Sequence, residues 1–573
     1  MELLKVENLT FTYPKQNPDA AEPEPTLQNV SFQVQEGAFV VVCGESGCGK
    51  TTLLKLLKRE LAPAGERSGN IWFHGVEQAA LTEREAACEI GFVLQNPENQ
   101  TVTDKVWHEL AFGLENMGVP TPVIRRRVAE MACFFGIDDW FRKKTTELSG
   151  GQKQLLNLAA VMVMQPKLLI LDEPTSQLDP IAASDFINTL RKINKELGLT
   201  IIMTEHRLED VLWRDVDRIV LMGDGKILAD LHPDELLSTR LLEENGIREP
   251  LYLTALRYAG VELAPAKKPA HVDSVVIDEA DRKKMTDWFW SRPAAEAEKE
   301  HEPLLEVRNL TFGYERGRQT LRDVSLTIHK GEMVSIVGKN GAGKSTFSKL
   351  VCGFETPDSG EILFQGRDLL QENIRHRAKH IGYVMQNPNQ MISKTMIFDE
   401  VALSLRNMGK SEEEIREKVE ETLKVCGLFP FRNWPVSALS FGQKKRVTIA
   451  SVLVQDPDLI ILDEPTAGQD FHHYTEIMEF LRGLNEKGVT VVMITHDMHL
   501  MLEYTPRALV FADGRLIADR SAAAVLCDPQ LIRQAALKET SLFTLANQLG
   551  ISPAEEFVQR FIEEDREVRS HGR

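Results

Sequence analysis

Hydrophobic and polar positions along the chain form one pattern that occurs twice: a short apolar run, then a glycine-rich loop. Residues 38–43 and 333–337 are the apolar runs, and their length and flanking turn residues predict buried strands. Residues 53–57, after the first loop, carry leucine at four of five positions and predict the start of a helix. The pattern therefore predicts a strand–loop–helix unit and a second copy of its loop.

Other segments extend this pattern along the chain. Apolar runs and alternating residues predict further strands at residues 6–13, 26–35, 91–94, 168–171 and 199–203. Helical periodicity predicts helices at residues 102–117, 123–135 and 153–164, and two similar helical segments at 241–261 and 531–551.

Both glycine-rich loops match the pattern G-x-x-x-x-G-K-[ST]. Glycines let successive backbone N–H groups turn inward as a cradle for phosphate, and the lysine and the helix N-terminus add positive charge. The hydroxyl after the lysine can complete a Mg²⁺ shell. A tight strand-to-helix turn is the alternative, but the flanking elements favour a phosphate site. The loops consist of Gly44, Glu45, Ser46, Gly47, Cys48, Gly49, Lys50, Thr51 and Thr52, and of Gly338, Lys339, Asn340, Gly341, Ala342, Gly343, Lys344, Ser345 and Thr346.

A nearly constant offset relates the two halves of the sequence. The loop lysines lie 344 − 50 = 294 residues apart, and most of the other paired motifs recur at offsets of 290 or 291. A shift held over half a chain indicates an internal duplication.

Composition limits the partners that this chain can have. Its 573 residues leave room for two large units, and 43% hydrophobic with 27% charged residues is typical of a soluble globular protein. A formal charge of −18 opposes a broad electrostatic grip on nucleic acid or anionic lipid. No segment predicts a signal peptide or a membrane span, so at a membrane we expect another protein to hold this one.

Cysteine usage adds one open question. Seven cysteines without a C-x-x-C pair are typical of reduced thiols in a cytosol. Cys48 stands beside Lys50, where positive surroundings can lower a thiol pKa. We favour the alternative, in which Cys48 is a small side chain that fills space.

Adjacent acids end one of the predicted strands. Asp172 and Glu173 directly follow the apolar residues 168–171. Two acids at the end of a buried strand do not suit a hydrophobic core, but they do suit a reaction site. Asp172 can orient Mg²⁺ through water, and Glu173 can polarise an attacking water.

Further polar candidates follow other strands. Gln95 opens a polar loop after residues 91–94. A lone histidine such as His206 is more often structural, but His496 occupies the matching place and reverses that expectation. Tyr13, at the end of the first strand, can lay its ring against adenine; an ordinary half-buried tyrosine is an equal alternative.

A second anion site is predicted at the start of the helix over residues 153–164. Ser149 is a good N-cap, and the glycine pair after it leaves backbone donors open at a helix N-terminus. The motif consists of Ser149, Gly150, Gly151 and Gln152.

Together these residues resemble the nucleotide-binding domain of ATP-binding cassette (ABC) proteins, over nearly all of residues 1–225 and 303–520. Seven motifs stand in the family order: A-loop, Walker A, Q-loop, LSGGQ signature, Walker B, D-loop and histidine switch; the signature is the most specific. The resemblance implies an α/β fold with two P-loop NTPase domains, each with a RecA-like core, an antiparallel β subdomain and a helical signature subdomain. It also implies that Tyr13 stacks on adenine, Gln95 touches Mg²⁺ and the attacking water, and His206 holds the γ-phosphate.

The second half carries the matching residues, with one departure from the family pattern. Phe441 replaces a signature glycine, and we expect it to be tolerated because the serine hydroxyl and the next N–H remain. Both halves keep the Walker B glutamate and the switch histidine, so neither site is predicted to be degenerate. The matching residues are Tyr314, Gln386, Ser440, Phe441, Gly442, Gln443, Asp463, Glu464, Asp470 and His496.

In the family two cassettes pair head to tail over ATP, which here implies two composite sites formed within one chain. One site would use Lys50, Thr51, Asp172, Glu173 and His206 with Ser440 and Gly442. The other would use Lys344, Ser345, Asp463, Glu464 and His496 with Ser149 and Gly151. ATP is the implied substrate, and the implied Mg²⁺ ligands are Thr51, Gln95 and Asp172, and Ser345, Gln386 and Asp463.

The domain boundaries follow from the duplication and from composition. We expect cassettes at residues 1–225 and 303–520, each followed by a helical appendage (226–263 and 521–573). Residues 264–302 are rich in alanine, proline and charge and predict a flexible acidic linker. The linker contains Trp288, Phe289 and Trp290, for which docking onto a cassette is favoured over contact with a membrane partner.

The Q-loop regions resemble those of energy-coupling factor (ECF) importer ATPases. The resemblance rests on residues 95–100 and 386–390, with 108–118 and 399–409. It implies a groove for coupling helices of an integral membrane T-component, which holds a substrate-binding S-component. It further implies a peripheral place on the cytoplasmic face of a prokaryotic membrane and uptake of a vitamin, a precursor, or cobalt or nickel ions.

Three alternatives remain beside the ECF interpretation. A ribosome-associated twin cassette of the ABC-F kind would carry a long charged helical linker, whereas this linker is acidic and broken by prolines, so no nucleic-acid partner is expected. A non-ECF transporter ATPase differs only in Q-loop context. A non-hydrolysing clamp is opposed by Glu173 and Glu464. The transported substrate cannot be read from this polypeptide.

Overall fold

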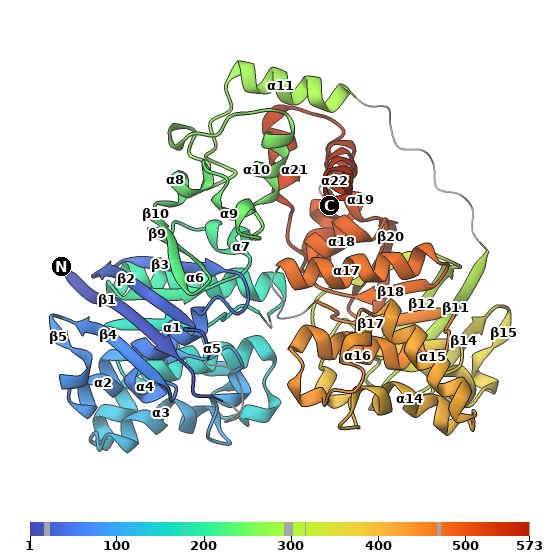
Figure 1. The fold of residues 1–573 in the computed structure, drawn as a ribbon, viewed down its shortest axis with the longest axis horizontal. Helices are drawn as coiled ribbons and strands as arrows, with labels where there is room; N and C mark the ends of the chain where they lie inside the picture. Colours follow the sequence, from blue (N-terminus) through green and yellow to red (C-terminus); the bar gives the residue numbers. More distant parts are fainter. Residues whose placement is uncertain (16–22, 177, 292–301, 316, 467–470, 572–573) are drawn as a thin grey trace. The chain divides into compact units, whose positions relative to one another are not determined.

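The computed structural model describes residues 1–15, 23–176, 178–291, 302–315, 317–466 and 471–571 (Figure 1). The chain forms two compact units, and one gives way to the other inside a single helix, α11 (Glu279–Trp290), between Met285 and Thr286. Each unit carries one of the two glycine-rich loops.

A six-stranded sheet forms the centre of the first unit, in the order β10-β9-β3-β8-β7-β6. All neighbours pair in parallel except β9 and β10, which pair antiparallel. Helices cover a parallel sheet on both faces, so its strands are continuous apolar runs, as every residue of β3 is buried. The strands are β3 (Phe39–Gly44), β6 (Ile90–Val93), β7 (Leu168–Leu171), β8 (Thr200–Thr204), β9 (Arg218–Gly223) and β10 (Lys226–Leu231).

An antiparallel sheet of order β2-β1-β4-β5 lies beside this core. Buried and exposed residues alternate along β2, as expected of a strand with one solvated face. Its inward side chains and those of the six-stranded sheet join one hydrophobic cluster. The strands are β1 (Glu2–Thr12), β2 (Leu27–Gln35), β4 (Glu66–Phe73) and β5 (Val76–Glu77).

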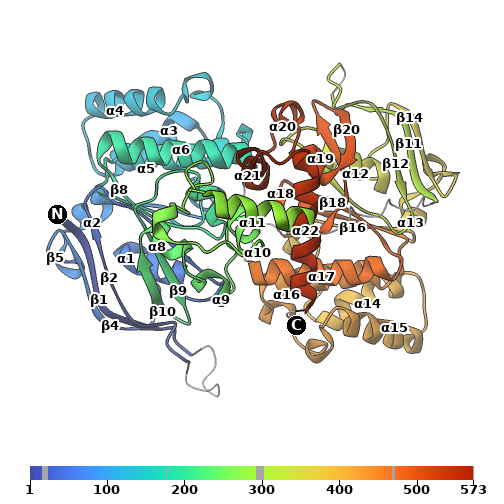
Figure 2. The same cartoon turned by 90° about the horizontal axis from the view of Figure 1, so that it is seen from above.

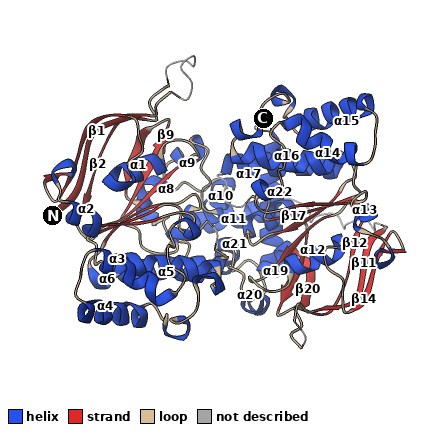
Figure 3. Cartoon of the chain, turned by 90° about the horizontal axis from the view of Figure 1, so that it is seen from below, coloured by secondary structure: helices blue, strands red, loops and turns tan. Residues whose placement is uncertain are grey.

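Helices α3, α4 and α5 pack together as the predicted helical signature subdomain, which Figure 3 shows in blue. The helices of this cassette are α1 (Lys50–Leu57), α2 (Glu83–Glu89), α3 (Val106–Asn116), α4 (Thr121–Phe134), α5 (Gly150–Met162), α6 (Pro180–Leu197) and α7 (Leu208–Leu212). Every strand and helix predicted for the first cassette is present, with ends shifted by a few residues.

The second unit repeats this architecture. Its sheets have the orders β12-β11-β14-β15 and β16-β17-β18-β13-β19-β20, which correspond strand for strand to those of the first unit. The strands are β11 (Pro303–Phe312), β12 (Leu321–His329), β13 (Met333–Val337), β14 (Ser359–Phe364), β15 (Arg367–Asp368), β16 (Ile381–Val384), β17 (Leu459–Asp463), β18 (Thr490–Ile494), β19 (Arg507–Ala512) and β20 (Arg515–Ser521). The helices, with α14–α16 as the signature subdomain (Figure 2), are α12 (Lys344–Cys352), α13 (Ile374–Arg377), α14 (Ile397–Asn407), α15 (Glu412–Val425), α16 (Phe441–Leu453), α17 (Phe471–Glu486) and α18 (Met498–Tyr504).

Short 3₁₀ helices connect several of these elements. They are η1 (Arg59–Leu61), η2 (Gln78–Ala80), η3 (Pro97–Asn99), η4 (Asp138–Trp140), η5 (Thr145–Glu147), η6 (Pro265–Lys267), η7 (Leu369–Gln371), η8 (Pro388–Gln390), η9 (Phe429–Phe431) and η10 (Val436–Ala438).

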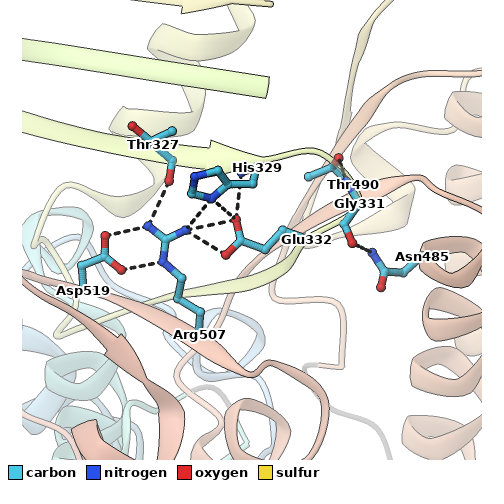
Figure 4. A network of polar contacts seen from close by, with 8 residues as sticks. All are labelled: Thr327, His329, Gly331, Glu332, Asn485, Thr490, Arg507 and Asp519. Atoms are coloured by element: carbon cyan, nitrogen blue, oxygen red, sulfur yellow. Dashed lines mark hydrogen bonds and ion pairs between the residues drawn. The ribbon is translucent and has the colours of Figure 1, made fainter. Parts of the chain in front are cut away.

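Arg507 ties the two sheets of the second unit together (Figure 4). Its guanidinium donates to Asp519 on β20, to Glu332 and to the carbonyl oxygen of Thr327 on β12. Hydrogen bonds to Asp519 raise the pKa of Arg507, as expected of a charge-assisted, forked contact. Arg218 makes the matching contacts with Asp230 in the first unit.

Both appendages are helical, but each predicted segment is divided in two. Residues 241–261 form α9 and α10, separated by Gly246 with a φ of +64° and by Pro250, which precedes the first turn of α10. Residues 531–551 are divided by Ala536 in a left-handed conformation. The appendage helices are α8 (Pro233–Leu237), α9 (Leu241–Glu244), α10 (Leu251–Tyr258), α19 (Ala522–Leu526), α20 (Pro529–Ala535), α21 (Ser541–Leu549) and α22 (Ala554–His571).

The end of the first cassette and the structure of the linker differ from the sequence-based expectation. Strand β10 lies beyond residue 225 but pairs with β9, so the first cassette extends through it. The first part of the expected flexible linker is structured, since it contains η6 and the twelve-residue helix α11. Residues 292–301, the rest of the expected linker, lie outside the described residues.

Candidate nucleotide sites

Both glycine-rich loops lie between a buried strand and a helix, as predicted. Gly49 and Gly343 precede α1 and α12 with φ of +102° and +101°, a conformation that glycine adopts readily. A Cβ on Gly49 would also lie 2.7 Å from Leu27 Cδ2. Only glycine fits these positions without a shift of the surroundings.

The loop lysines fold back over their own loops. Lys50 Nζ donates to the carbonyl oxygens of Gly44 and Glu45, both at 2.8 Å. Lys344 Nζ donates to Gly338 O at 2.6 Å and to Lys339 O at 3.0 Å. Each ammonium group is therefore held by two carbonyl oxygens at the start of its own loop.

The hydroxyl and the first Walker B acid meet in the first cassette. Thr51 Oγ1 donates to Asp172 Oδ1 at 3.0 Å, and Thr204 Oγ1 donates to the same oxygen at 2.9 Å. Burial raises the pKa of Asp172. A hydroxyl beside a carboxylate is a hard oxygen donor set of the kind that Mg²⁺ prefers, usually together with waters and phosphate.

The second cassette has the same pair with a different neighbour. Tyr383 OH donates to Asp463 Oδ2 at 3.0 Å, and Ser345 also hydrogen-bonds this carboxylate. Burial raises the pKa of Asp463.

Two predicted catalytic residues of the first cassette, His206 and Gln95, both contact a third, Glu173. Glu173 Oε1 lies 2.6 Å from His206 Nε2, and its other oxygen accepts a hydrogen bond of 2.7 Å from Gln95 Nε2. In the second cassette Glu464 Oε1 lies 2.6 Å from His496 Nδ1. The side chain of the matching Gln386 is exposed.

Both Walker B glutamates adopt a strained backbone conformation. Glu173 has a φ of +44° and Glu464 a φ of +47°. Non-glycine residues rarely occupy this region, which costs on the order of 1–3 kcal/mol, and such residues cluster at functional sites. Both cassettes therefore hold this acid in the same backbone conformation.

The signature motifs form capping boxes at the starts of α5 and α16. Ser149 Oγ accepts from Gln152 N, and Gln152 Oε1 accepts from Ser149 N. Ser440 and Gln443 make the same two bonds, so the backbone cap survives the glycine replacement at Phe441. The side chain of Phe441 lies outside the described part of the chain.

The A-loop tyrosines are both exposed, Tyr314 more than Tyr13. The Tyr13 hydroxyl lies 3.0 Å from Thr52 Oγ1, which places its ring beside the phosphate loop. Stacking on adenine therefore stays a prediction that this position allows.

The remaining sequence candidates divide into described and undescribed residues. Cys48 is buried, and burial raises its pKa, which agrees with a side chain that fills space. Asp179, which matches Asp470 at an offset of 291, is the aspartate of the first D-loop and caps α6 by accepting from Ala182 N at 2.9 Å. Asp470 of the second D-loop lies outside the described residues.

Sequence reasoning missed a buried lysine behind the second Q-loop. Lys445 Nζ donates to the carbonyl oxygens of Met385 and Gln386, both at 2.8 Å, and burial lowers its pKa to about 8. The matching residue, at 445 − 291 = 154, is Gln154, whose buried amide has no hydrogen-bond partner among the described residues. The Q-loops are therefore supported differently in the two cassettes.

Neither a metal cluster nor a membrane-spanning helix occurs in the part of the chain that the structure describes. No group of three or more histidine, cysteine, aspartate or glutamate side chains in these ranges is arranged to hold a metal ion. No helix among the same residues has the length and apolar character needed to cross a bilayer.

Three features define an ATP-binding cassette. A phosphate loop follows a buried parallel strand, an acid pair ends the strand two places along the sheet, and a signature helix is capped at its start. Family models agree with this class. The model described as ABC transporter matches residues 27–176 and 321–467, and the model described as ATP-binding cassette cobalt transporter matches residues 239–312.

Known relatives match over nearly the whole chain. Proteins named as ABC transporter ATP-binding proteins in Clostridium perfringens and Enterococcus faecalis are each 48% identical, and the matches cover 96% and 99% of this chain and 97% and 99% of theirs. CbiO1 from C. perfringens, described as part of the ABC transporter complex CbiONQ, is 35% identical over 41% of this chain and 94% of its own, with a TM-score of 0.38. The chain belongs to the ABC transporter ATP-binding proteins. It is an ATPase with two cassettes, and its hydrolysis of ATP is coupled to transport.

Proposed function

We propose that this protein is the motor subunit of an ECF-type importer and works on the cytoplasmic face of a prokaryotic membrane. The observation that carries the proposal is the match of residues 239–312, across the appendage and linker, to a family described as ATP-binding cassette cobalt transporter. The ECF-like Q-loop sequences support it independently. The transported substrate would be a cobalt or nickel ion, a vitamin or a precursor.

In this proposal each cassette prepares one ATP for attack by water. The ammonium groups of Lys50 and Lys344 offset the charge that develops on the phosphoryl group. Glu173, bonded through one oxygen to His206 and through the other to Gln95, is held as the group that polarises water. Mg²⁺ bound at Thr51 and Asp172 would neutralise phosphate charge.

The two cassettes are proposed to complete each other's sites. The signature helices α5 and α16 offer open N–H groups and a serine hydroxyl, which suit a γ-phosphate but lack a lysine. Pairing Lys50 with Ser440, and Lys344 with Ser149, would supply both parts. A single chain raises the effective concentration of the two faces.

The proposed coupling surface begins beside the Q-loop. Val102, between η3 and α3, is 65% exposed, and Glu98 reaches the surface as an ion pair with Lys153 at 2.8 Å. An exposed apolar side chain beside an acid suits a basic, partly apolar coupling helix of a T-component. The T-component would in turn hold the S-component that selects the substrate.

Affinity purification from detergent-solubilised membranes tests this function. We expect an integral membrane protein to co-purify with the wild type and to be lost with Val102→Glu. Val276→Glu is the matched control, since Val276 is also exposed (50%) but lies in the linker region. Both variants should still bind ATP. Pelleting with ribosomes, without membrane partners, would instead support the ABC-F alternative.

A further inference from the structure

The two Walker B aspartates are held by hydroxyl groups that come from opposite sides. In the first cassette Thr204, at the end of β8, donates to Asp172 at 2.9 Å. In the second cassette Tyr383, on β16, donates to Asp463 at 3.0 Å. β8 and β16 correspond to different neighbours of the strand that carries the acids.

The register of the sheets shows that neither donor has a counterpart in the other cassette. Tyr383 pairs with Ile461 as Phe92 pairs with Ile170, so 383 − 291 = 92 and the matching residue lacks a hydroxyl. Met493 pairs with Leu462 as Met203 pairs with Leu171, so Thr204 corresponds to Ile494. Each cassette has a hydroxyl at one of the two positions and an apolar side chain at the other.

A donor at this place matters because the carboxylates are removed from water. Asp172 is buried and Asp463 largely so. A buried carboxylate needs hydrogen bonds to keep its charge and its orientation, and hydrogen bonds to a charged group are stronger than those between neutral groups. Without the donor, the carboxylate would keep the hydrogen bond from Thr51 or Ser345 but would lose a second bond that fixes its orientation.

We propose that Thr204 and Tyr383 are positioning residues that orient the metal-directing aspartates, each for its own ATP site. The inference rests on the proposed role of Asp172 and Asp463 toward Mg²⁺. The Thr204 hydroxyl at the end of β8 and the Tyr383 phenol on β16 each donate a hydrogen bond to the aspartate of their own site, from different strands.

The two hydroxyl donors differ in whether they also bond the neighbouring Walker B glutamate. Thr204 Oγ1 also accepts the N–H of Glu173 at 2.9 Å, so one hydroxyl anchors both acids of the first site. In the second site the N–H of Glu464 donates to the carbonyl oxygen of Ile494 at 2.9 Å. Loss of Thr204 should therefore disturb both acids of the first site, whereas loss of Tyr383 should disturb only the metal-directing aspartate of the second site.

Isosteric variants with transplanted donors test the proposal. Binding of Mn²⁺ in the presence of a non-hydrolysable ATP analogue is followed by the electron paramagnetic resonance signal of free Mn²⁺. We expect two bound ions per chain in the wild type, with the affinity of one class about tenfold weaker in Thr204→Val and of the other in Tyr383→Phe. Adding Phe92→Tyr to the first variant, and Ile494→Thr to the second, should restore the affinity.

Three outcomes decide the matter. Unchanged Mn²⁺ affinities in both single variants, or a folded double variant without recovery, overturn the positioning role. If one pair does not fold, as judged by circular dichroism, the other pair still decides. Asp172→Asn and Asp463→Asn serve as reference: unchanged Mn²⁺ binding in these two would show that the assumed aspartate role fails, independently of Thr204 and Tyr383.

Discussion

Lys445 is a buried cation whose ammonium group donates to the carbonyl oxygens of Met385 and Gln386 at the second Q-loop. Burial lowers its pKa to about 8, from 10.5 in the unfolded chain. Between these two values the unfolded chain binds a proton that the folded chain has released, so stability rises with pH. Below about pH 8 both states are protonated and this gain is absent.

We therefore expect a pH-dependent difference between the wild type and Lys445→Met. From pH 7.5 to 10.5 the free energy of unfolding of the wild type should rise relative to the variant by roughly 2–3 kcal/mol, at about 1.4 kcal/mol per pKa unit. Urea unfolding at several pH values measures this. Lys444→Met, at the partly exposed neighbour, should follow the wild type; an equal slope in Lys445→Met would contradict the prediction.

The residues that carry local chemistry could be predicted from the sequence, and those that act across strands could not. Short motifs contain Lys50, Glu173 and Ser149, and the spacing of these motifs predicts a role for each residue. Thr204 and Tyr383 act through the register of strands far apart in the sequence, and no local pattern marks them. Their hydrogen bonds and the register of the sheets in the structure identify them.

At the scale of elements, helix α11 shows where the aromatic side chains of residues 288–290 pack. Phe289 is 2% exposed, and its ring centroid lies 6.2 Å from that of Phe557 on α22. Trp288 meets Phe557 edge-on at 5.7 Å, whereas Trp290 is 68% exposed. These contacts dock Trp288 and Phe289 onto the second unit's appendage, whereas the sequence favoured docking onto a cassette.

Phe289→Ala should release α11 from α22. Truncation of a buried phenylalanine typically costs about 3–5 kcal/mol, a large share of the stability of a short peripheral helix. We expect tryptic cleavage at Lys283 and Lys284 to become roughly ten times faster or more, as followed by electrophoresis. Trp290→Ala is the control and should leave the rate unchanged. Equal rates in all three proteins would show that the Phe289 contact does not hold the helix.

The sequence predicted elements correctly where the apolar pattern is strong. The prediction was wrong for part of the linker, where it rested on composition alone. The strands predicted at residues 38–43, 91–94, 168–171, 199–203 and 333–337 are continuous apolar runs, and all five are present in the structure. Residues 264–291 are rich in charge and alanine, yet the buried Phe289 gives their helix a packing partner. Tertiary contact at a few apolar positions overrode the average composition.

At the scale of the whole molecule, duplication produced two cassettes of one topology with unequal details. Strand order and signature caps agree, while the donors to Asp172 and Asp463 and the support of the two Q-loops differ. Sequence offsets predicted the shared architecture because insertions between the motifs are few. The differences arise from single substitutions, which leave the offsets unchanged.

Pairs of substitutions test whether the cassettes complete each other's sites. With composite sites, Lys50→Ala and Ser440→Ala damage the same site and leave the other intact, whereas Lys50→Ala and Ser149→Ala damage one site each. Both serines form the same capping box, so each alanine costs a similar amount, about 1 kcal/mol, of helix stability.

The measurement is ATP retained per chain after gel filtration, in a Glu173→Gln and Glu464→Gln background that should bind ATP without hydrolysing it. We expect clear retention with Lys50→Ala and Ser440→Ala, and close to none with Lys50→Ala and Ser149→Ala. The reverse order would mean that each cassette uses its own signature helix, because the second pair would then fall within one site. Equal retention would contradict any contribution of the signature serines to ATP binding.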